Sequence, residues 1–406
     1  MWPGIVAAGV LVVKLGLMLG KPLGVSVAMA ETFGNLGWGE MQIRVWGWLV
    51  QVVIVILLAK KTRSGWVALI AAANPWLNTI SMWHVWETTA LAGAVGVWAA
   101  KHTWQKAIGA VVVVLALAAT WTNLSKISSD NLAAKLNWNF LGQQVDEIQK
   151  INFQATQKNY MLPAIVRKIL YNKPGLALNT IVQRSVALMD FEQWTAPQAA
   201  WTATGLSGLP PKGLLPLIYY WDIPLLIFTI VIFDKKRVKW WLVGGWLGGI
   251  FLDKKFFTVG GVLFIPAIVV LVAEAVKRLD KRLVLVLYLA GTGFFFKEMF
   301  FNQLKWQYSD VYLYRQTAMW LKNNLAADAR AAVTNKFGPM DVMLKFYKVL
   351  PNSNIEVGEF TPSPGKVYIG LPKEMRGIPE DKIVTRIEAD DELVYGYGKG
   401  LWIAKY

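Results

Sequence analysis

The sequence predicts an α-helical polytopic membrane protein with about nine transmembrane helices and a small C-terminal external α/β domain. The first observation is composition: 55% of the residues are apolar, 17% are charged and the mean hydropathy is +0.38. Such values are typical of a chain whose solvent is largely lipid. The second is that lysine and arginine crowd every second loop between the apolar runs. The third is an abrupt change after residue 298, where charged residues intersperse and spanning runs stop.

The transmembrane domain is predicted to cover residues 1–298. Its apolar stretches are long enough to cross a bilayer when tilt and wet ends are allowed for. The two stretches within 65–100 are short, which leaves a partly re-entrant arrangement open. The stretches are 2–20, 43–59, 65–82, 86–100, 106–122, 214–233, 239–252, 257–276 and 283–298.

The basic loops predict the orientation, because positive charge concentrates on the cytoplasmic side of a bilayer. We expect a plasma-membrane protein with a cytoplasmic N-terminus and an extracytoplasmic C-terminal domain. The formal charge of +16 is then explained by these loops and by anionic lipid headgroups, and nucleic acid is not an expected partner. Residues 2–20 lack a basic n-region and a small-residue cleavage site, so we expect a retained span. The basic clusters are Lys60, Lys61 and Arg63; Lys101 and Lys106; Lys235, Lys236, Arg237 and Lys239; and Lys277, Arg278, Lys281 and Arg282.

Two outward segments are too long to be simple connectors. Residues 123–213 contain Tyr160–Leu170 and Leu176–Met189, where apolar residues recur at helical spacing, and we expect these helices to lie along the outer membrane surface. A break at Asn172, Lys173, Pro174 and Gly175 separates them, because proline lacks an amide donor and glycine tolerates a sharp turn.

The second outward segment, residues 299–406, is predicted to form the small α/β domain. Lys366–Leu371 and Lys382–Ile387 are short β-branched stretches typical of strands. Tyr312–Leu325 has the spacing of a helix.

Four stretches together resemble one family of membrane enzymes. They are Arg44-Val-Trp-Gly-Trp-Leu; Asn74-Pro75-Trp76 through Ser81 with Trp86-Glu87; Leu162-Pro163, Arg167, Tyr171-Asn172-Lys173 and Phe191; and Tyr219-Tyr220-Trp221-Asp222-Ile223-Pro224. In order and position, over roughly residues 40–350, the chain resembles polyprenyl-phosphate-sugar-dependent glycosyltransferases of the C-type (GT-C) fold, which include protein mannosyltransferases and aminoarabinose transferases. The resemblance implies transfer of a sugar from a polyprenyl-phosphate donor to a lipid, glycan or protein acceptor at the outer face.

Such a transfer needs a carboxylate that deprotonates the acceptor hydroxyl. The family commonly places an acidic pair in the first outer loop, whereas residues 21–43 here hold only Glu31 and Glu40. Glu31 is the candidate catalytic base, and its alternative is an ordinary interfacial carboxylate. Glu40 is expected to be structural, as the partner of Arg44 four residues later on one helix face.

The leaving phosphate needs cations near the membrane surface. Lys254 and Lys255, which follow Asp253 in a short outward turn, are the candidate donor-phosphate ligands, and the resemblance adds Arg167. The alternative for the two lysines is that they extend to lipid headgroups.

The candidate pocket-lining residues lie near the outer ends of the predicted helices. For the carboxylates an alternative is a place in a helix first turn, where the dipole favours acidic side chains. For the histidine the alternative is an interfacial position, and for the lysine a surface helix near lipid. The candidates are Glu87, Asp222, His84 and Lys173.

The sequence gives no reason to expect a cofactor. The absence of cysteine rules out disulfides and thiolate metal sites, and two histidines cannot build a multi-histidine metal centre alone. Two other functions stay open: a catalytically degenerate relative that acts as a binding or assembly subunit, and a transporter, whose spans should show paired internal repeats and buried charges near the midplane.

Overall fold

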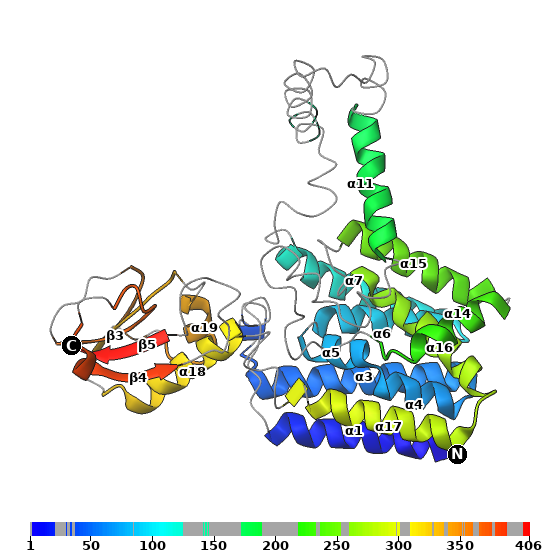
Figure 1. The fold of residues 1–406 in the computed structure, drawn as a ribbon, viewed down its shortest axis with the longest axis horizontal. Coiled ribbons are helices and arrows are strands. Elements are labelled where there is room, and N and C mark those ends of the chain that lie inside the picture. Colours follow the sequence, from blue (N-terminus) through cyan, green and yellow to red (C-terminus); the bar gives the residue numbers. More distant parts are fainter. Residues whose placement is uncertain are drawn as a thin grey trace, which may run out of the picture. The chain divides into compact units, whose positions relative to one another are not determined.

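A computed structural model gives the fold, and the chain separates into two compact units. The helical unit comprises Met1–Val10 and Leu49–Thr292, and the mixed unit comprises Leu11–Trp48 and Gly293–Tyr406. Figure 1 shows the chain coloured from blue at the N-terminus to red at the C-terminus. The structure describes residues 2–20, 30, 33–34, 37–83, 85–124, 141, 143, 145, 172–188, 218–232, 236–252, 260–297, 299–300, 309–326, 329–336, 340–350, 352, 354–359, 365–375, 378–387 and 401–406.

The described part of the chain is mostly helical, and at least one helix overlaps each predicted apolar stretch. Two of them, α1 (Trp2–Gly20) and α3 (Glu40–Thr62), contribute residues to both units. The other helices at these stretches are α4 (Gly65–Ala73), α5 (Pro75–Trp83), α6 (Val85–Ala99), α7 (Thr103–Leu124), α14 (Asp222–Ile232), α15 (Lys236–Leu252), a 3₁₀ turn (Gly260–Leu263) with α16 (Phe264–Val276), and α17 (Lys281–Lys297).

The stretch predicted as one helix over 65–82 is two helices, which corrects the prediction. Asn74 ends α4, and its side-chain oxygen accepts a hydrogen bond of 2.8 Å from the amide of Leu77 in the first turn of α5. Pro75 begins α5, a position where its missing amide costs nothing, and it restricts the residue before it to extended conformations. The chain therefore caps and restarts the helix at this point.

Two helices are long and apolar enough to cross a membrane, namely α1 with 19 residues and α3 with 23. Two shorter apolar helices cover Thr103–Ala119 and Phe264–Val276. Length and composition in the described part of the chain therefore show two candidate spans, and the nine-span topology stays a prediction.

Helix α16 forms the centre of the helical unit. Every residue of α16 except Glu274 is buried, and the helix contacts α4, α14 and α15. The contact with α15 is close, because a Cβ on Gly245 would come within 2.5 Å of the ring of Phe264. A helix that is apolar all round is typical of the core of a large helical assembly.

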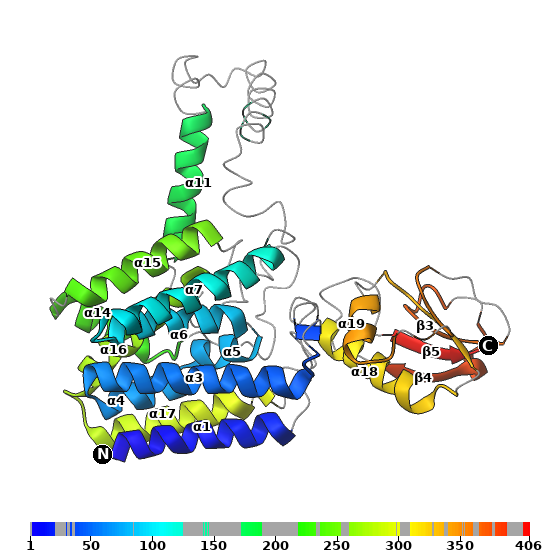
Figure 2. The same cartoon turned by 180° about the vertical axis from the view of Figure 1, so that it is seen from behind.

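Helices α6 and α7 pack together through glycine (Figure 2). A Cβ on Gly93 would lie 2.8 Å from the carbonyl oxygen of Gly109, and a Cβ on Gly109 would lie 2.9 Å from that of Gly93. Small residues let two helix backbones approach this closely. Any side chain at either position must push the helices apart.

Helix α11 (Lys173–Leu188) confirms the predicted helix over Leu176–Met189, but it begins three residues earlier, at Lys173. Asn172 precedes α11, and its side-chain oxygen accepts a 2.6 Å hydrogen bond from the amide of Gly175. Pro174 and Gly175 thus lie inside the first turn, where proline is tolerated, and the break is at Asn172. The predicted helix over Tyr160–Leu170 lies outside the described residues.

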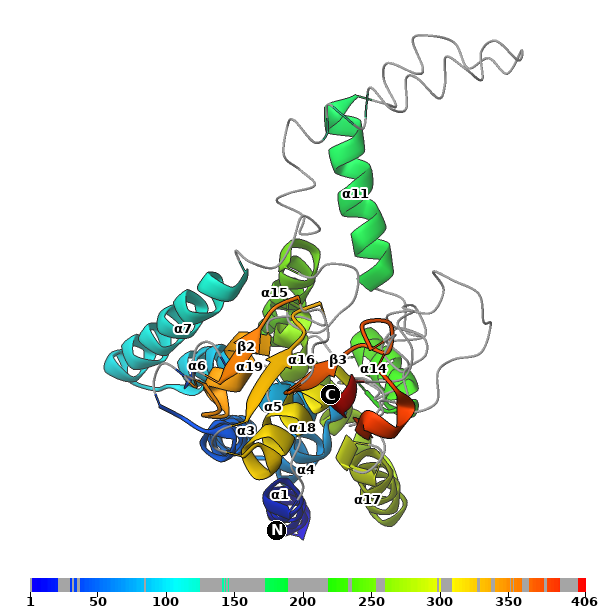
Figure 3. The ribbon, with the colours of Figure 1, turned by 90° about the vertical axis from the view of Figure 1, so that its left-hand side faces the viewer.

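The mixed unit contains a five-stranded sheet of order β2-β1-β3-β5-β4. Strand β1 pairs in parallel with β2 and β3, and β5 pairs antiparallel with β3 and β4. Figure 3 views this unit from another direction. The elements are α18 (Ser309–Asn324), β1 (Arg330–Val333), α19 (Met340–Phe346), β2 (Ile355–Val357), β3 (Lys366–Gly370), β4 (Ile383–Ile387) and β5 (Leu401–Lys405).

The predicted strands Lys366–Leu371 and Lys382–Ile387 and the predicted helix Tyr312–Leu325 are confirmed as β3, β4 and α18. One face of the sheet is closed by a buried cluster that includes Ala332, Tyr368 and Ala404, from three neighbouring strands. Burial of both faces of the central strands explains why β1 and β3 are almost wholly apolar.

The α6–α7 packing predicts different effects for two alanine substitutions in α6. Gly93→Ala should lower the free energy of unfolding by about 1–3 kcal/mol, because its Cβ meets backbone that cannot rotate away. Gly96→Ala is the matched control, since its nearest neighbour would be a Leu57 methyl at 3.9 Å. Thermal unfolding of the purified chain measures both. Equal unfolding temperatures for the two variants would contradict the packing.

Candidate functional site

A cluster of charged and phenolic side chains joins the start of α3 to α18 and α19 within the mixed unit. Glu40, the first residue of α3, forms an ion pair with Arg44, which confirms the predicted pairing. The second carboxylate oxygen of Glu40 accepts a 3.2 Å hydrogen bond from Nε of Arg315 and a 3.4 Å hydrogen bond from the hydroxyl of Tyr347. Arg44 also donates to the carbonyl oxygen of Met18 at 3.5 Å.

Both oxygens of Glu40 are therefore occupied. The Arg44 side chain is 5% exposed and those of Glu40 and Arg315 are 15% and 16% exposed, so the cluster is largely shielded from solvent. Burial raises the pKa of the Tyr347 hydroxyl, and the nearby carboxylate of Glu40 acts in the same direction. The tyrosine thus stays a neutral hydrogen-bond donor. This arrangement fits a structural tie and directs neither carboxylate oxygen to an acceptor hydroxyl.

A second cluster surrounds Asp222 in the helical unit. Asp222 begins α14 and is 1% exposed. One of its oxygens accepts a hydrogen bond from the hydroxyl of Tyr288 on α17, and the other accepts a 3.2 Å hydrogen bond from the amide of Tyr219. A first-turn carboxylate that accepts from an amide three residues earlier holds the chain where the helix begins.

Aromatic side chains close this cluster. The rings of Tyr219 and Trp221 stack with centroids 4.7 Å apart, and Tyr219 and Tyr288 meet edge to face at 5.8 Å. The hydroxyl of Tyr219 donates to the carbonyl oxygen of Ala73 at 2.9 Å and lies 3.3 Å from the hydroxyl of Thr292. Asp222 could line a sugar pocket only if these contacts opened. Its geometry instead matches the alternative prediction, a carboxylate in the first turn of a helix.

A third set of polar side chains lies among the apolar helices, and its members hydrogen-bond to one another and to nearby backbone carbonyl oxygens. Ser81 donates to Gln51 at 3.0 Å, Gln51 donates to Asn78 at 3.0 Å, and Asn78 donates to the carbonyl oxygens of Ala72 and Asn74 at 2.9 Å. All three side chains are fully buried. Ser81 belongs to one of the stretches that carry the family resemblance, and here it joins α5 to α3.

The other predicted site residues divide into two groups. Glu87 lies in the first turn of α6 and is half-buried, and Lys173 is the first residue of α11 and is also half-buried. The remaining candidates lie outside the described residues, so their roles stay predictions: Glu31, His84, Arg167, Lys254 and Lys255. Within the ranges that the structure describes, no group of three acidic or histidine side chains could hold a metal ion.

Sequence reasoning missed Arg315, Tyr347, Tyr288 and Gln51. Two of them carried a signal, since Gln51 and Tyr288 are polar groups within long apolar runs and must find partners there. Arg315 and Tyr347 carried none, because each meets Glu40 from about 275 or 307 residues away in the sequence.

The described structure is thus a mainly helical protein with two membrane-length apolar helices and a mixed α/β unit. No protein-family model, no curated protein and no solved structure matches the chain. Residue-level resemblance and geometry are therefore the basis for the function proposed below.

We expect removal of the negative charge at the centre of the Glu40 cluster to destabilise the fold strongly. Glu40→Gln should lower the free energy of unfolding by about 3 kcal/mol, because two shielded guanidinium groups lose the carboxylate between them. Asp341→Asn is the control, since its pair with Lys345 at 3.9 Å is half or more exposed, and its loss should cost less than about 1 kcal/mol. Chemical denaturation of the two variants measures the difference. Similar losses for both would show that the cluster does not stabilise the fold.

Proposed function

We propose that the protein is an integral membrane glycosyltransferase that moves a sugar from a polyprenyl-phosphate donor to a lipid, glycan or protein acceptor at the outer face of the plasma membrane. The observation that carries this proposal is the order of the elements. In the described part of the chain, helices overlap the predicted apolar stretches, and the five-stranded sheet comes after them in the sequence. The two membrane-length helices, α1 and α3, flank the loop that carries the candidate base.

The proposed reaction assigns each candidate a step. Glu31 takes the proton of the acceptor hydroxyl, and the acceptor oxygen then attacks the anomeric carbon of the donor sugar. The bond between that carbon and the phosphate oxygen breaks, and the leaving phosphate keeps the electron pair. Lys254, Lys255 and Arg167 stabilise the phosphate as it leaves. Glu87, His84 and Lys173 are the proposed pocket-lining residues, and no cofactor takes part. Asp222 would join them only if its hydrogen bonds to Tyr288 and Tyr219 opened.

One observation favours a second candidate, a degenerate relative that serves as a binding or assembly subunit. The first outer loop has no acidic pair, and Glu40, one of its two carboxylates, is engaged through both oxygens. Glu31 is then the one carboxylate of this loop that remains for catalysis. The two candidates therefore differ in what happens when this residue is changed.

The first test is transfer of a radiolabelled sugar from a panel of polyprenyl-phosphate sugars by the purified chain. Wild-type protein should release labelled sugar from at least one donor, and Glu31→Gln should abolish transfer, because an amide cannot accept the proton. Glu359→Gln is the control: this carboxylate side chain is 75% exposed in the mixed unit, and its loss should leave transfer unchanged. Undiminished transfer by Glu31→Gln removes the candidate base, and no transfer by wild type favours the subunit.

The second test concerns topology and uses the absence of cysteine from the chain. Single substitutions Asn172→Cys, Asn352→Cys and Lys101→Cys place one thiol at exposed positions. A membrane-impermeant maleimide added to intact cells should label the first two, whereas the third should react only after permeabilisation, because Lys101 belongs to a predicted cytoplasmic loop. Labelling of Asn172→Cys and Asn352→Cys from opposite sides would end the glycosyltransferase proposal.

A further inference from the structure

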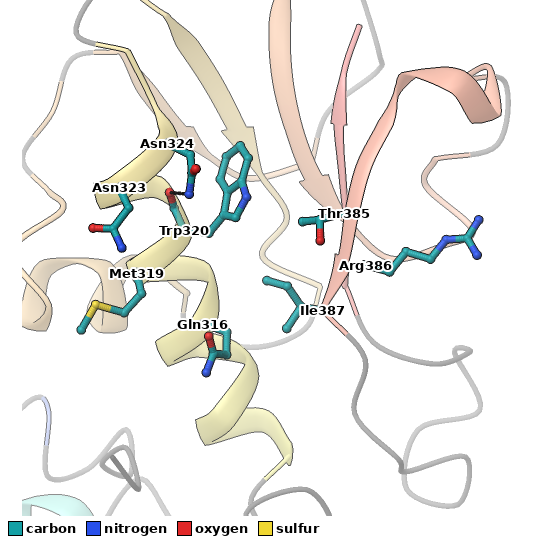
Figure 4. A pocket seen from close by; sticks show the side chains of 8 residues that line it. All are labelled: Gln316, Met319, Trp320, Asn323, Asn324, Thr385, Arg386 and Ile387. Carbon is teal, nitrogen blue, oxygen red and sulfur yellow. Dashed lines mark hydrogen bonds between the residues drawn. The ribbon is translucent and has the colours of Figure 1, made fainter. Parts of the chain in front are cut away.

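A groove of about 370 Å³ lies between α18 and β4 in the mixed unit. Strand β4 is an edge of the sheet, so the groove is bounded by a helix on one side and by the last strand on the other. Figure 4 shows the side chains that line it. They are Gln316, Met319, Trp320, Asn323, Asn324, Thr385, Arg386 and Ile387.

Helical spacing places three of these residues in one row. Gln316, Trp320 and Asn324 follow one another at intervals of four, so they share one face of α18 with an indole between two carboxamides. Thr385 and Ile387 alternate along β4 and project toward the helix, as Figure 4 shows, whereas Arg386 points away. The carboxamide of Asn324 donates a 3.1 Å hydrogen bond to the carbonyl oxygen of Trp320.

The lining offers neutral hydrogen-bonding groups and one aromatic face. Each carboxamide has both donors and an acceptor, and the threonine hydroxyl can act as either, which matches the dual character of a sugar hydroxyl. None of the described residues that line the groove is a carboxylate. Its cation, Arg386, hydrogen-bonds to Glu380 at 2.7 Å and lies 4.7 Å from the ring of Trp402, so it is engaged away from the groove.

We propose that this groove binds a neutral saccharide, with one sugar ring stacked on Trp320. Gln316 and Asn324 bond hydroxyls at opposite edges of that ring, and Thr385 bonds it from the strand. The volume is at the lower end of the range of about 300–1,000 Å³ for small-molecule pockets, so it suits one or two sugar rings. Trp320 is partly exposed.

A peptide added as a further strand along β4 is the competing occupant, because edge strands accept such pairing. Two features favour the saccharide. The register of β4 against β5 shifts between Ile383 and Thr385, and such a bulge makes an edge a poor template for a further strand. The lining also has three carboxamides, a hydroxyl and one indole against two aliphatic side chains, Met319 and Ile387, whereas a peptide site needs apolar pockets for alternate side chains.

This site does not depend on the proposed transfer reaction, because it shares no residue with the candidate base, phosphate ligands or pocket. It would hold a saccharide whether the chain transfers sugars or serves as a binding subunit. Binding is therefore measured without donor lipid and without a transfer assay.

The test is ligand-observed saturation-transfer NMR with the full chain in a detergent whose headgroup is not a sugar. The probes are cellotetraose, mannotetraose and chitotetraose, with trigalacturonate as a charged comparison. At least one neutral probe should bind, and trigalacturonate should bind more weakly. Trp320→Ala should raise the Kd by at least about tenfold, and Trp320→Phe, which keeps an aromatic face, by less.

Trp104→Ala is the matched control, since Trp104 on α7 is 62% exposed and belongs to the helical unit, whereas the groove belongs to the mixed unit. Gln316→Ala removes a carboxamide alone, and it should weaken binding even if Trp320→Ala does not fold. The proposal is overturned if no neutral probe binds. It is also overturned if the Trp320 and Gln316 variants bind like wild type, or if an extended peptide competes for the same site with higher affinity.

Discussion

Polar groups buried among apolar helices are the constraint on which the helical unit depends. A hydrogen-bonding group without a partner in such surroundings costs several kcal/mol, so each one must be paired within the protein. Gln51, Asn78 and Ser81 pair across α3 and α5, and Asp222 pairs with Tyr288 across α14 and α17. These pairings fix which helices can be neighbours, whereas apolar burial alone would allow many arrangements.

Close backbone contacts add a second constraint on which helices can be neighbours. Gly93 and Gly109 let α6 and α7 approach, and Gly245 lets α15 rest on Phe264. A Cβ at Gly291 would come within 2.7 Å of the Trp221 ring, next to the Asp222 cluster. The glycines therefore set how closely these helices and side chains approach one another.

Local sequence patterns predicted much of this fold. They could not predict contacts between residues that are far apart in the sequence. Apolar runs predicted the helix positions because such runs are a local property of the sequence, and Pro75 carried the signal for the break at Asn74. Strand β1, with the sequence Arg-Ala-Ala-Val, was not predicted, because alanine has little preference for strands and only the pairing with β2 and β3 makes it one. At the candidate site, the helical spacing of Glu40 and Arg44 predicted their pairing, but Arg315 reaches the same carboxylate from a distant part of the chain.

Helix α18 connects the two features of the mixed unit that bear on function. Arg315 holds one face of the helix to Glu40, and the next residue, Gln316, begins the row that faces β4. Because consecutive residues on a helix are about 100° apart, an anchor at Arg315 fixes the rotation of the whole helix. The stacking face of Trp320 and the reach of Gln316 and Asn324 therefore depend on a carboxylate at the start of α3. A tie whose contacts are structural thus also bears on the geometry of the groove, and a loosened tie would change the proposed saccharide binding without any contact to the saccharide.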